Sequence, residues 1–170
     1  MTPTRRATPR ACCWARPDGG LDWLAAFEHS GEDYGYKAFT DTVDAMVIGR
    51  NTYDIVLGFS PWPYAGKRCI VLTHRPATPR HGEEFFAGTP EALVDKLDRD
   101  GVRRAYIDGG DVIRQFLDAG LVDDMTLSMI PLVLGSGIPL FTKGSAERRL
   151  RLVESKSFPT GLVQLSYRTG

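Results

Sequence analysis

Short apolar runs alternate along this chain with segments whose apolar residues recur at helical spacing. An apolar run of about four to eight residues is typical of a buried strand, and a repeat of about 3.6 residues is typical of an amphipathic helix. The runs predict strands at 11–15, 45–48, 67–73, 83–87, 105–107, 125–134, 150–155 and 162–167, and the repeats predict helices at 34–43, 50–58, 90–101 and 110–119. Residues 21–27 fit either a short helix or a packed loop, and residues 135–139 a tight turn.

This order predicts an α/β fold with helices on both faces of a mostly parallel sheet, because strands and helices alternate through most of the chain. The last two strands follow each other across the turn Pro159–Gly161 without a helix, so they predict an antiparallel hairpin at one edge. At 170 residues and 18.8 kDa, a single domain is the simplest organisation.

The segment Ala105–Leu117 carries the clearest local signal in the chain. A strand meets Gly109 and Gly110, and a helical pattern follows at once. Glycines let the backbone approach a ligand closely, and the start of a helix favours an anion such as phosphate. An ordinary tight turn between strand and helix explains the two glycines equally well, and the Gly-x-Gly-x-x-Gly dinucleotide pattern is absent.

Residues that could bind a phosphate also lie at the ends of two other predicted strands. Gly49, Arg50 and Thr52 follow the strand at 45–48, and they offer an open backbone, a cation and a hydroxyl to a phosphate. Thr73-His74-Arg75 ends the strand at 67–73, on the edge where open α/β sheets bind ligands. As alternatives, Arg50 is a solvated residue of the first helical turn, Thr52 makes a local backbone hydrogen bond, and Arg75 is an exposed loop cation.

The composition excludes several classes of function. Lys plus Arg (21) balance Asp plus Glu (21), and the pI near 6.8 predicts no general attraction to nucleic acid or to a membrane surface. No apolar run approaches the roughly 20 residues of a transmembrane helix. The three cysteines and three histidines show no metal-binding spacing. A cytoplasmic protein without a metal, a membrane or a nucleic-acid partner is expected.

Five motifs in order give the chain a family resemblance: Ala15–Leu24, Val43–Tyr53, Val71–Arg75, Ile107–Gly110 and Pro131–Phe141. With them the chain resembles the dihydrofolate-reductase-like superfamily, and specifically the C-terminal reductase domain of bifunctional riboflavin-biosynthesis proteins and its stand-alone bacterial relatives. The resemblance implies a three-layer α/β/α sandwich. It also implies an NADPH-dependent reductase acting on a small pyrimidine- or pteridine-like heterocycle, with a homodimer expected by analogy.

The resemblance also implies roles for individual residues. The NADPH pyrophosphate is expected at Gly49, Arg50, Thr52, Gly109, Gly110, Asp111, Val112 and Ile113, and the adenosine 2′-phosphate at Thr73, His74 and Arg75. Asp22 is the candidate proton donor, with a surface helix cap as its alternative role. Trp23 and Tyr36 are expected to wall the substrate side, with core packing as the alternative.

Residues 1–14 depart from the family pattern, so the reductase domain is expected to span residues 15–170. The segment has three arginines, no acidic residue and no apolar first strand, which suggests a disordered tail or a shifted reading frame. Loss of that strand makes a nucleotide-binding protein of the same fold without turnover the alternative function. A non-enzymatic interaction protein is the third candidate.

Overall fold

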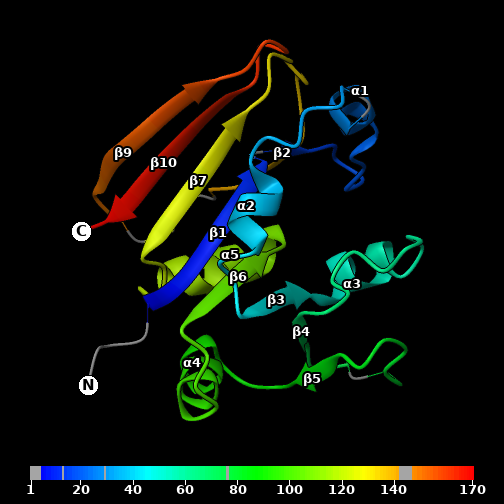
Figure 1. Ribbon diagram of the computed structural model, residues 1–170, viewed down its shortest axis with the longest axis vertical. Helices are drawn as coiled ribbons and strands as arrows, with labels where there is room; N and C mark the ends of the chain where they lie inside the picture. The colour runs from blue at the N-terminus through cyan, green and yellow to red at the C-terminus, as the bar shows by residue number, and fades with distance from the viewer. Residues whose placement is uncertain (1–4, 13, 29, 76, 142–146) are drawn as a thin grey trace.

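A computed structural model describes residues 5–12, 14–28, 30–75, 77–141 and 147–170. Its centre is an eight-stranded sheet in the order β5-β4-β3-β6-β1-β7-β10-β9, in which the first six strands are parallel and β10 pairs antiparallel with both β7 and β9. Figure 1 shows β9 at one end of this sheet and β5 at the other. In the described part of the chain, no helix has the length and apolar character that crossing a bilayer requires.

The strands and helices largely follow the predicted order. The strands of the main sheet are β1 (Arg5–Cys12), β3 (Ala45–Gly49), β4 (Arg68–Leu72), β5 (Glu84–Phe86), β6 (Arg104–Asp108), β7 (Asp124–Met129), β9 (Leu150–Ser157) and β10 (Val163–Thr169). The helices are a 3₁₀ turn η1 (Asp22–Leu24) and α1 (Ala25–Glu28), α2 (Tyr36–Thr40), α3 (Arg50–Val56), α4 (Pro90–Arg99) and α5 (Gly110–Asp118). A separate two-stranded pair joins β2 (Trp14–Ala15) to β8 (Ile138–Pro139).

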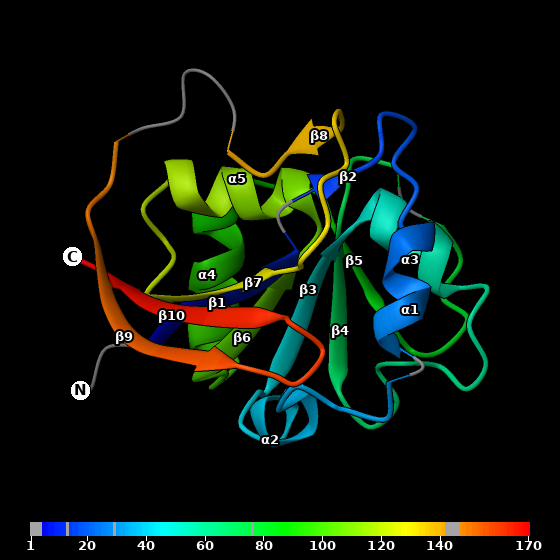
Figure 2. The same cartoon turned by 90° about the horizontal axis from the view of Figure 1, so that it is seen from above.

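The central strands β3, β4 and β6 are buried on both faces, which explains why they read as continuous apolar runs. On one face, alternate residues such as Val47, Ile70 and Ile107 pack with α4 and α5. On the other face, Met46 and Val71 pack with Tyr53 and Val56 of α3 and with Phe39 of α2. Figure 2 shows α4 and α5 on one side of the sheet and α2 on the other. The three-layer α/β/α sandwich is confirmed.

The register of the central strands brings three strand ends to one edge of the sheet. Gly49 at the end of β3 pairs with Leu72 at the end of β4, and Ile48 pairs with Asp108 at the end of β6. Because the strands are parallel and adjacent, the segments that follow them emerge side by side. The sequence prediction of a shared carboxyl edge is therefore confirmed.

The expectation of a disordered N-terminal tail is wrong for residues 5–12. These residues form β1, which lies between β6 and β7 and pairs in parallel with both. Its first half, through Pro9, pairs with β6 and its second half, from Arg10, pairs with β7, and this tertiary context outweighs a composition poor in strand-forming residues. Residues 1–4 and 13 lie outside the described residues, and the reading-frame hypothesis concerns the gene and stays a prediction.

Several predicted boundaries also differ from the structure. The strand predicted at 125–134 ends at Met129, two residues before Pro131, which lacks the N–H that a strand needs. Residues 138–139 pair with β2 as the strand β8 and are not part of a tight turn. The helix predicted at 34–43 is reduced to α2, and residues 21–27 form η1 with the first turn of α1.

Candidate functional site

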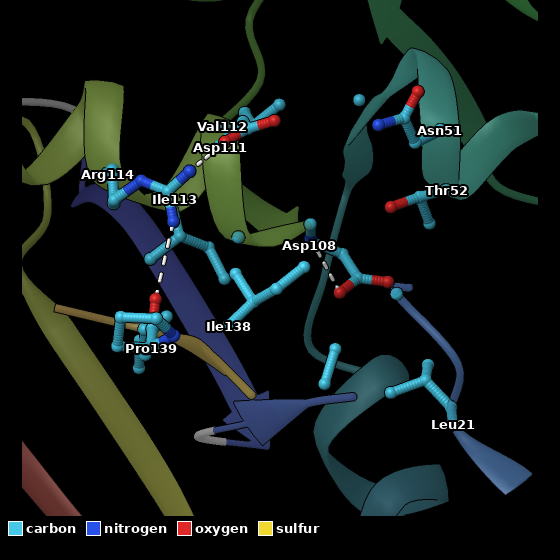
Figure 3. Close-up of a pocket in the computed structure, with 16 residues that line it drawn as sticks. Leu21, Asn51, Thr52, Asp108, Asp111, Val112, Ile113, Arg114, Ile138 and Pro139 are labelled. Carbon is cyan, nitrogen blue, oxygen red and sulfur yellow. Dashed lines mark hydrogen bonds and ion pairs between the residues drawn. The ribbon is translucent and has the colours of Figure 1, made fainter. Parts of the chain in front are cut away.

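A cavity of about 340 Å³ opens at the carboxyl ends of β3 and β6. We call it the first cavity. Its walls come from the starts of α3 and α5, from the β2–β8 pair and from the segment before η1. Figure 3 shows Thr52 on one side of this space, Ile138 and Pro139 on the other, and Asp108 between them. Its described lining residues are Ala15, Gly19, Leu21, Gly49, Asn51, Thr52, Asp108, Gly109, Gly110, Asp111, Val112, Ile113, Arg114, Ile138, Pro139 and Leu140.

Two glycines let the starts of α3 and α5 approach each other in the floor of this cavity. A β carbon at Gly109 would lie 2.7 Å from Thr52 Oγ1, and the φ of +98° at Gly109 is one that other residues rarely adopt. A β carbon at Gly49 would lie 3.0 Å from Val112 Cγ2. Close packing of the two helix starts therefore accounts for both glycines, most strictly for Gly109, whatever ligand is bound.

The first turn of α5 faces the first cavity with backbone N–H groups that the helix itself does not use. The first N–H of the helix ladder belongs to Ile113, which donates to the Gly109 carbonyl at 2.9 Å. Gly110, Asp111 and Val112 precede it, and all three line the cavity. Such a helix start favours an anion, and α5 runs for nine residues.

A cation lies at the edge of the same turn. Arg114 lines the cavity and forms an ion pair with Asp111, and its Nη1 lies 3.4 Å from the Pro139 carbonyl oxygen. The Asp111 side chain is largely exposed, so a phosphate at the helix start would compete with a solvated carboxylate for Arg114. Arg114 therefore adds positive charge at the place where the backbone donors converge.

Asp108 is the acidic group inside the first cavity that the sequence analysis did not single out. Its Oδ1 accepts a hydrogen bond of 2.8 Å from the Gly109 backbone N–H, and its Oδ2 lies 3.5 Å from the Tyr64 hydroxyl. Burial raises the pKa of this carboxyl, and the two hydrogen bonds lower it by less. The carboxyl group of Asp108 therefore holds its proton more tightly than a carboxyl group in water does.

The predicted 2′-phosphate residues lie outside the first cavity but are tied to its margin. Arg50 donates from Nη1 to the Arg75 carbonyl at 2.6 Å while its Nε bonds Asp54. The Arg75 backbone N–H donates to Thr73 Oγ1 at 3.1 Å, so the backbone after β4 curls into a local turn. His74 and Arg75 are exposed. Arg50 thus links the start of α3 to the Thr73–Arg75 turn and is directed away from the cavity floor.

A buried carboxylate fixes the far end of the loop that carries this turn. Glu83 is almost fully buried and accepts hydrogen bonds from the Tyr53 hydroxyl and from the backbone N–H groups of Arg80 (2.8 Å) and His81 (2.7 Å). Burial alone would raise the pKa of Glu83, but these donors outweigh it and lower the pKa to about 2. The loop between β4 and β5 is therefore anchored to α3 at both ends.

The three remaining candidates lie at different places around η1 and α2. Asp22 is exposed and bonds Arg16 at 2.5 and 2.9 Å, and this hydrogen bond lowers the pKa of its carboxyl. A lowered pKa is the opposite of what a proton donor needs. Trp23 lines a second cavity, of about 490 Å³, and Tyr36 begins α2 with an exposed side chain. The roles proposed for all three stay predictions.

Besides Asp108, sequence reasoning missed eight lining residues: Ala15, Gly19, Leu21, Asn51, Arg114, Ile138, Pro139 and Leu140. Asn51 lies inside the Gly49–Tyr53 motif, and Arg114 follows the two glycines by one turn of helix, so both had a positional signal. Leu21 and the stretch Ile138–Leu140 belong to motifs quoted for the family resemblance. Their apolar side chains carry no chemical signal, and only the β2–β8 pairing brings them to the cavity.

Comparison with known proteins decides the family. The model of the RibD C-terminal domain matches residues 31–164. The chain belongs to this family. A curated relative of this RibD C-terminal domain is the uncharacterised Bacillus subtilis (strain 168) protein YwjB, which is 37% identical over 156 residues and is matched over 90% of this chain and 88% of its own length.

Solved structures agree with the family assignment. A Shewanella sp. PV-4 protein described as a candidate riboflavin biosynthesis protein has a TM-score of 0.88 at 30% identity, covering 97% of this chain and 99% of that one. A pyrimidine reductase-like protein from Corynebacterium diphtheriae has a TM-score of 0.68 at 18% identity, with 98% and 92% covered. The second likeness, at this identity, shows the fold alone. For this RibD C-terminal domain, the resemblance found from sequence is confirmed.

Proposed function

We propose that this RibD C-terminal domain is an NADPH-dependent reductase of a small pyrimidine- or pteridine-like heterocycle. The observation that carries the proposal is the convergence of two strand–glycine–helix junctions on one cavity, with Gly109 packed against Thr52. Seven of the eleven residues expected to hold the cofactor line that cavity: Gly49, Thr52, Gly109, Gly110, Asp111, Val112 and Ile113. The family membership supports the same activity.

The residues of the first cavity fit a dinucleotide. Gly49 and Gly109 let the starts of α3 and α5 lie close together, and the start of α5 offers N–H donors to a pyrophosphate. Arg114 supplies a cation beside them, and Arg75 stands exposed on the neighbouring strand end for a 2′-phosphate. When bound, NADPH supplies the hydride. The protein's own task is to hold the reacting carbons in line.

Asp108 is our candidate for the group that handles the proton, in place of Asp22. A carboxyl donates a proton at neutral pH only if its pKa is raised, as burial does for Asp108. The Gly109 N–H bond fixes the orientation of the carboxyl, and Oδ2 is left with the long contact to Tyr64. Asp108 would therefore hold a proton at Oδ2 inside the cavity.

The proposal is tested by titrating the protein with NADPH and NADH while following tryptophan fluorescence, and then by following NADPH consumption with pterin and pyrimidine candidates. We expect NADPH to bind at least tenfold more tightly than NADH, with consumption by one of the candidates. Binding without consumption would favour a nucleotide-binding protein without turnover. Failure to bind either cofactor would refute the proposal.

A further inference from the structure

The Arg114 side chain connects the start of α5 to the opposite wall of the first cavity. Its Nη2 forms the ion pair with Asp111 Oδ1, and its Nη1 donates to the Pro139 carbonyl oxygen at 3.4 Å. Figure 3 shows the guanidinium between these two partners. Asp111 belongs to the first turn of α5 and Pro139 to β8, so one side chain joins the two elements.

The wall that Arg114 reaches is a small unit of its own. Strand β8 has two residues, and it pairs with β2 in a sheet separate from the main one. Ala15 of β2 and Ile138 of β8 face each other in this pair, and both line the first cavity. A pair this short is marginally stable by itself, so one further contact to α5 changes how firmly it is held.

Asp111 acts on a bound phosphate in two opposite ways. Its backbone N–H is one of the three that precede the first bonded N–H of α5, and it favours an anion. Its carboxylate is negatively charged and holds the cation that the phosphate would use. The Asp111 side chain is 69% exposed and can return to water, whereas a phosphate offers Arg114 a bidentate partner beside three N–H donors. Replacement of the carboxylate by a phosphate is therefore favourable.

We propose that Arg114 exchanges Asp111 for the pyrophosphate of the cofactor and, through Nη1 and the Pro139 carbonyl, fastens the β2–β8 wall to the occupied start of α5. The Asp111 carboxylate competes with the ligand and weakens its binding. Arg114 is a positioning residue, because it acts on the wall and not on the reacting atoms. This exchange rests on the proposed NADPH binding and names how that site is regulated.

Titration calorimetry with inorganic pyrophosphate and with NADPH tests the exchange. Asp111→Asn removes the competing charge and is expected to tighten binding of both ligands about threefold to tenfold. Glu91→Gln is the matched control, because Glu91 is an exposed acid in the first turn of α4 and does not line the cavity. It should leave both affinities as they are. When Arg114→Gln is also present, Asp111→Asn should tighten binding clearly less, since no cation is left to release.

Hydrogen exchange with inorganic pyrophosphate tests the link to the wall, because this ligand has no nucleoside or nicotinamide that could contact the wall itself. Saturating pyrophosphate should slow the exchange of the Ala15 and Ile138 backbone N–H groups in the wild type. Arg114→Lys keeps the charge but lacks the planar fork that serves two partners. This variant should still bind pyrophosphate, with its exchange at Ala15 and Ile138 unchanged by the ligand.

Three results would overturn the exchange and leave the proposed reductase function standing. They are equal tightening by Asp111→Asn with and without Arg114, slowed exchange at Ile138 in Arg114→Lys, and absence of pyrophosphate binding to Asp111→Asn while NADPH binds. The first would mean that the carboxylate only repels the phosphate, and the second that the wall closes without Arg114. If pyrophosphate behaved as expected while NADPH failed to bind, the exchange would stand and the reductase function would be refuted.

Discussion

A β carbon at Gly109 would lie 2.7 Å from Thr52 Oγ1, so the turn after β6 and the first turn of α3 are in direct contact. The contact joins residues 57 positions apart at the floor of the first cavity. The contact exists because β3 and β6 are neighbours in register, β3 ends in Gly49, and Gly109 directly follows β6. No other residue type fits at Gly109 without moving Thr52 or the helix that carries it.

Gly109→Ala is expected to destabilise the protein and to weaken NADPH binding at least tenfold. The alanine adds the unfavourable positive φ, worth about 1–2 kcal/mol, and the overlap with Thr52. Gly101→Ala is the matched control, since Gly101 also has a positive φ (+76°) but a β carbon there would meet no atom within 4 Å. Urea unfolding and NADPH titration of both variants measure the two effects.

A double variant separates the cost of the positive φ at Gly109 from the cost of the overlap with Thr52. Adding Thr52→Ala to Gly109→Ala removes the overlapping oxygen and is expected to recover part of the lost stability. Equal stabilities for the Gly101→Ala and Gly109→Ala variants would contradict the close packing described for this floor.

Much of the fold was predictable because its signals are local. Thr89 accepts a hydrogen bond from the Ala92 N–H at 3.3 Å and Pro90 begins α4, as the sequence indicates. The apolar runs locate β3, β4 and β6 because both of their faces are buried. Most of strand β1 was not predictable, since its three arginines and one proline carry no strand signal and only pairing with β6 and β7 orders it.

The candidate site was predictable only where glycine or charge marks a strand end. Gly49, Gly109 and the α5 start were found in this way, and the register brings them together. Asp108 was missed although it stands beside Gly109, because an acidic residue before two glycines looks like a solvated turn. Its importance depends on burial, which arises from the packing of Tyr64 and the cavity walls.

Asp108→Asn is expected to reduce the rate of substrate reduction about 100-fold or more, the usual contribution of a general acid, while NADPH affinity changes little. The wild-type rate should fall as the pH rises through the raised pKa of Asp108, and the variant should lose this dependence. Asp22→Asn, which alters an exposed ion pair, serves as the control. If Asp108→Asn reduced the substrate at the wild-type rate, another group would have to supply the proton.

Asp108→Asn is expected to lower activity but not stability. The folded pKa of Asp108 lies above its unfolded value near 3.8, so its effect is absent below about pH 3.8, and stability falls as the pH rises from there through the raised pKa. Asp108→Asn removes this loss of stability. The variant is therefore expected to be at least as stable as the wild type in thermal unfolding at neutral pH, and a clear loss of stability would contradict the buried-carboxyl account.

The lowered pKa of Glu83 predicts that the protein loses stability in acid. Its pKa is lowered from 4.5 to about 2 in the folded state, so its contribution is present above about pH 4.5 and is lost as the pH falls toward 2. This lowering of the Glu83 pKa corresponds to at most about 3 kcal/mol of folding free energy at neutral pH. Glu83→Gln should lower stability at pH 7 and flatten this acid dependence in urea unfolding. Glu154→Gln on the exposed strand β9 should do neither.

Arg75→Ala is expected to weaken NADPH binding much more than NADH binding, because only NADPH carries the 2′-phosphate. Arg50 holds the Arg75 carbonyl, so the backbone turn should survive the substitution. Arg99→Ala, at the end of α4, is the control for the loss of one exposed cation. Equal losses for the two cofactors would refute the role assigned to Arg75.

Hydrogen exchange in the presence of NADPH tests the central claim most directly. The backbone N–H groups of Gly110, Asp111 and Val112 precede the first bonded N–H of α5 and are expected to receive the pyrophosphate. Saturating NADPH should slow their exchange and that of the Gly49–Thr52 turn, with little change across the exposed strand β9. Unchanged exchange at both turns, with NADPH demonstrably bound, would contradict the assignment of the first cavity as the cofactor site.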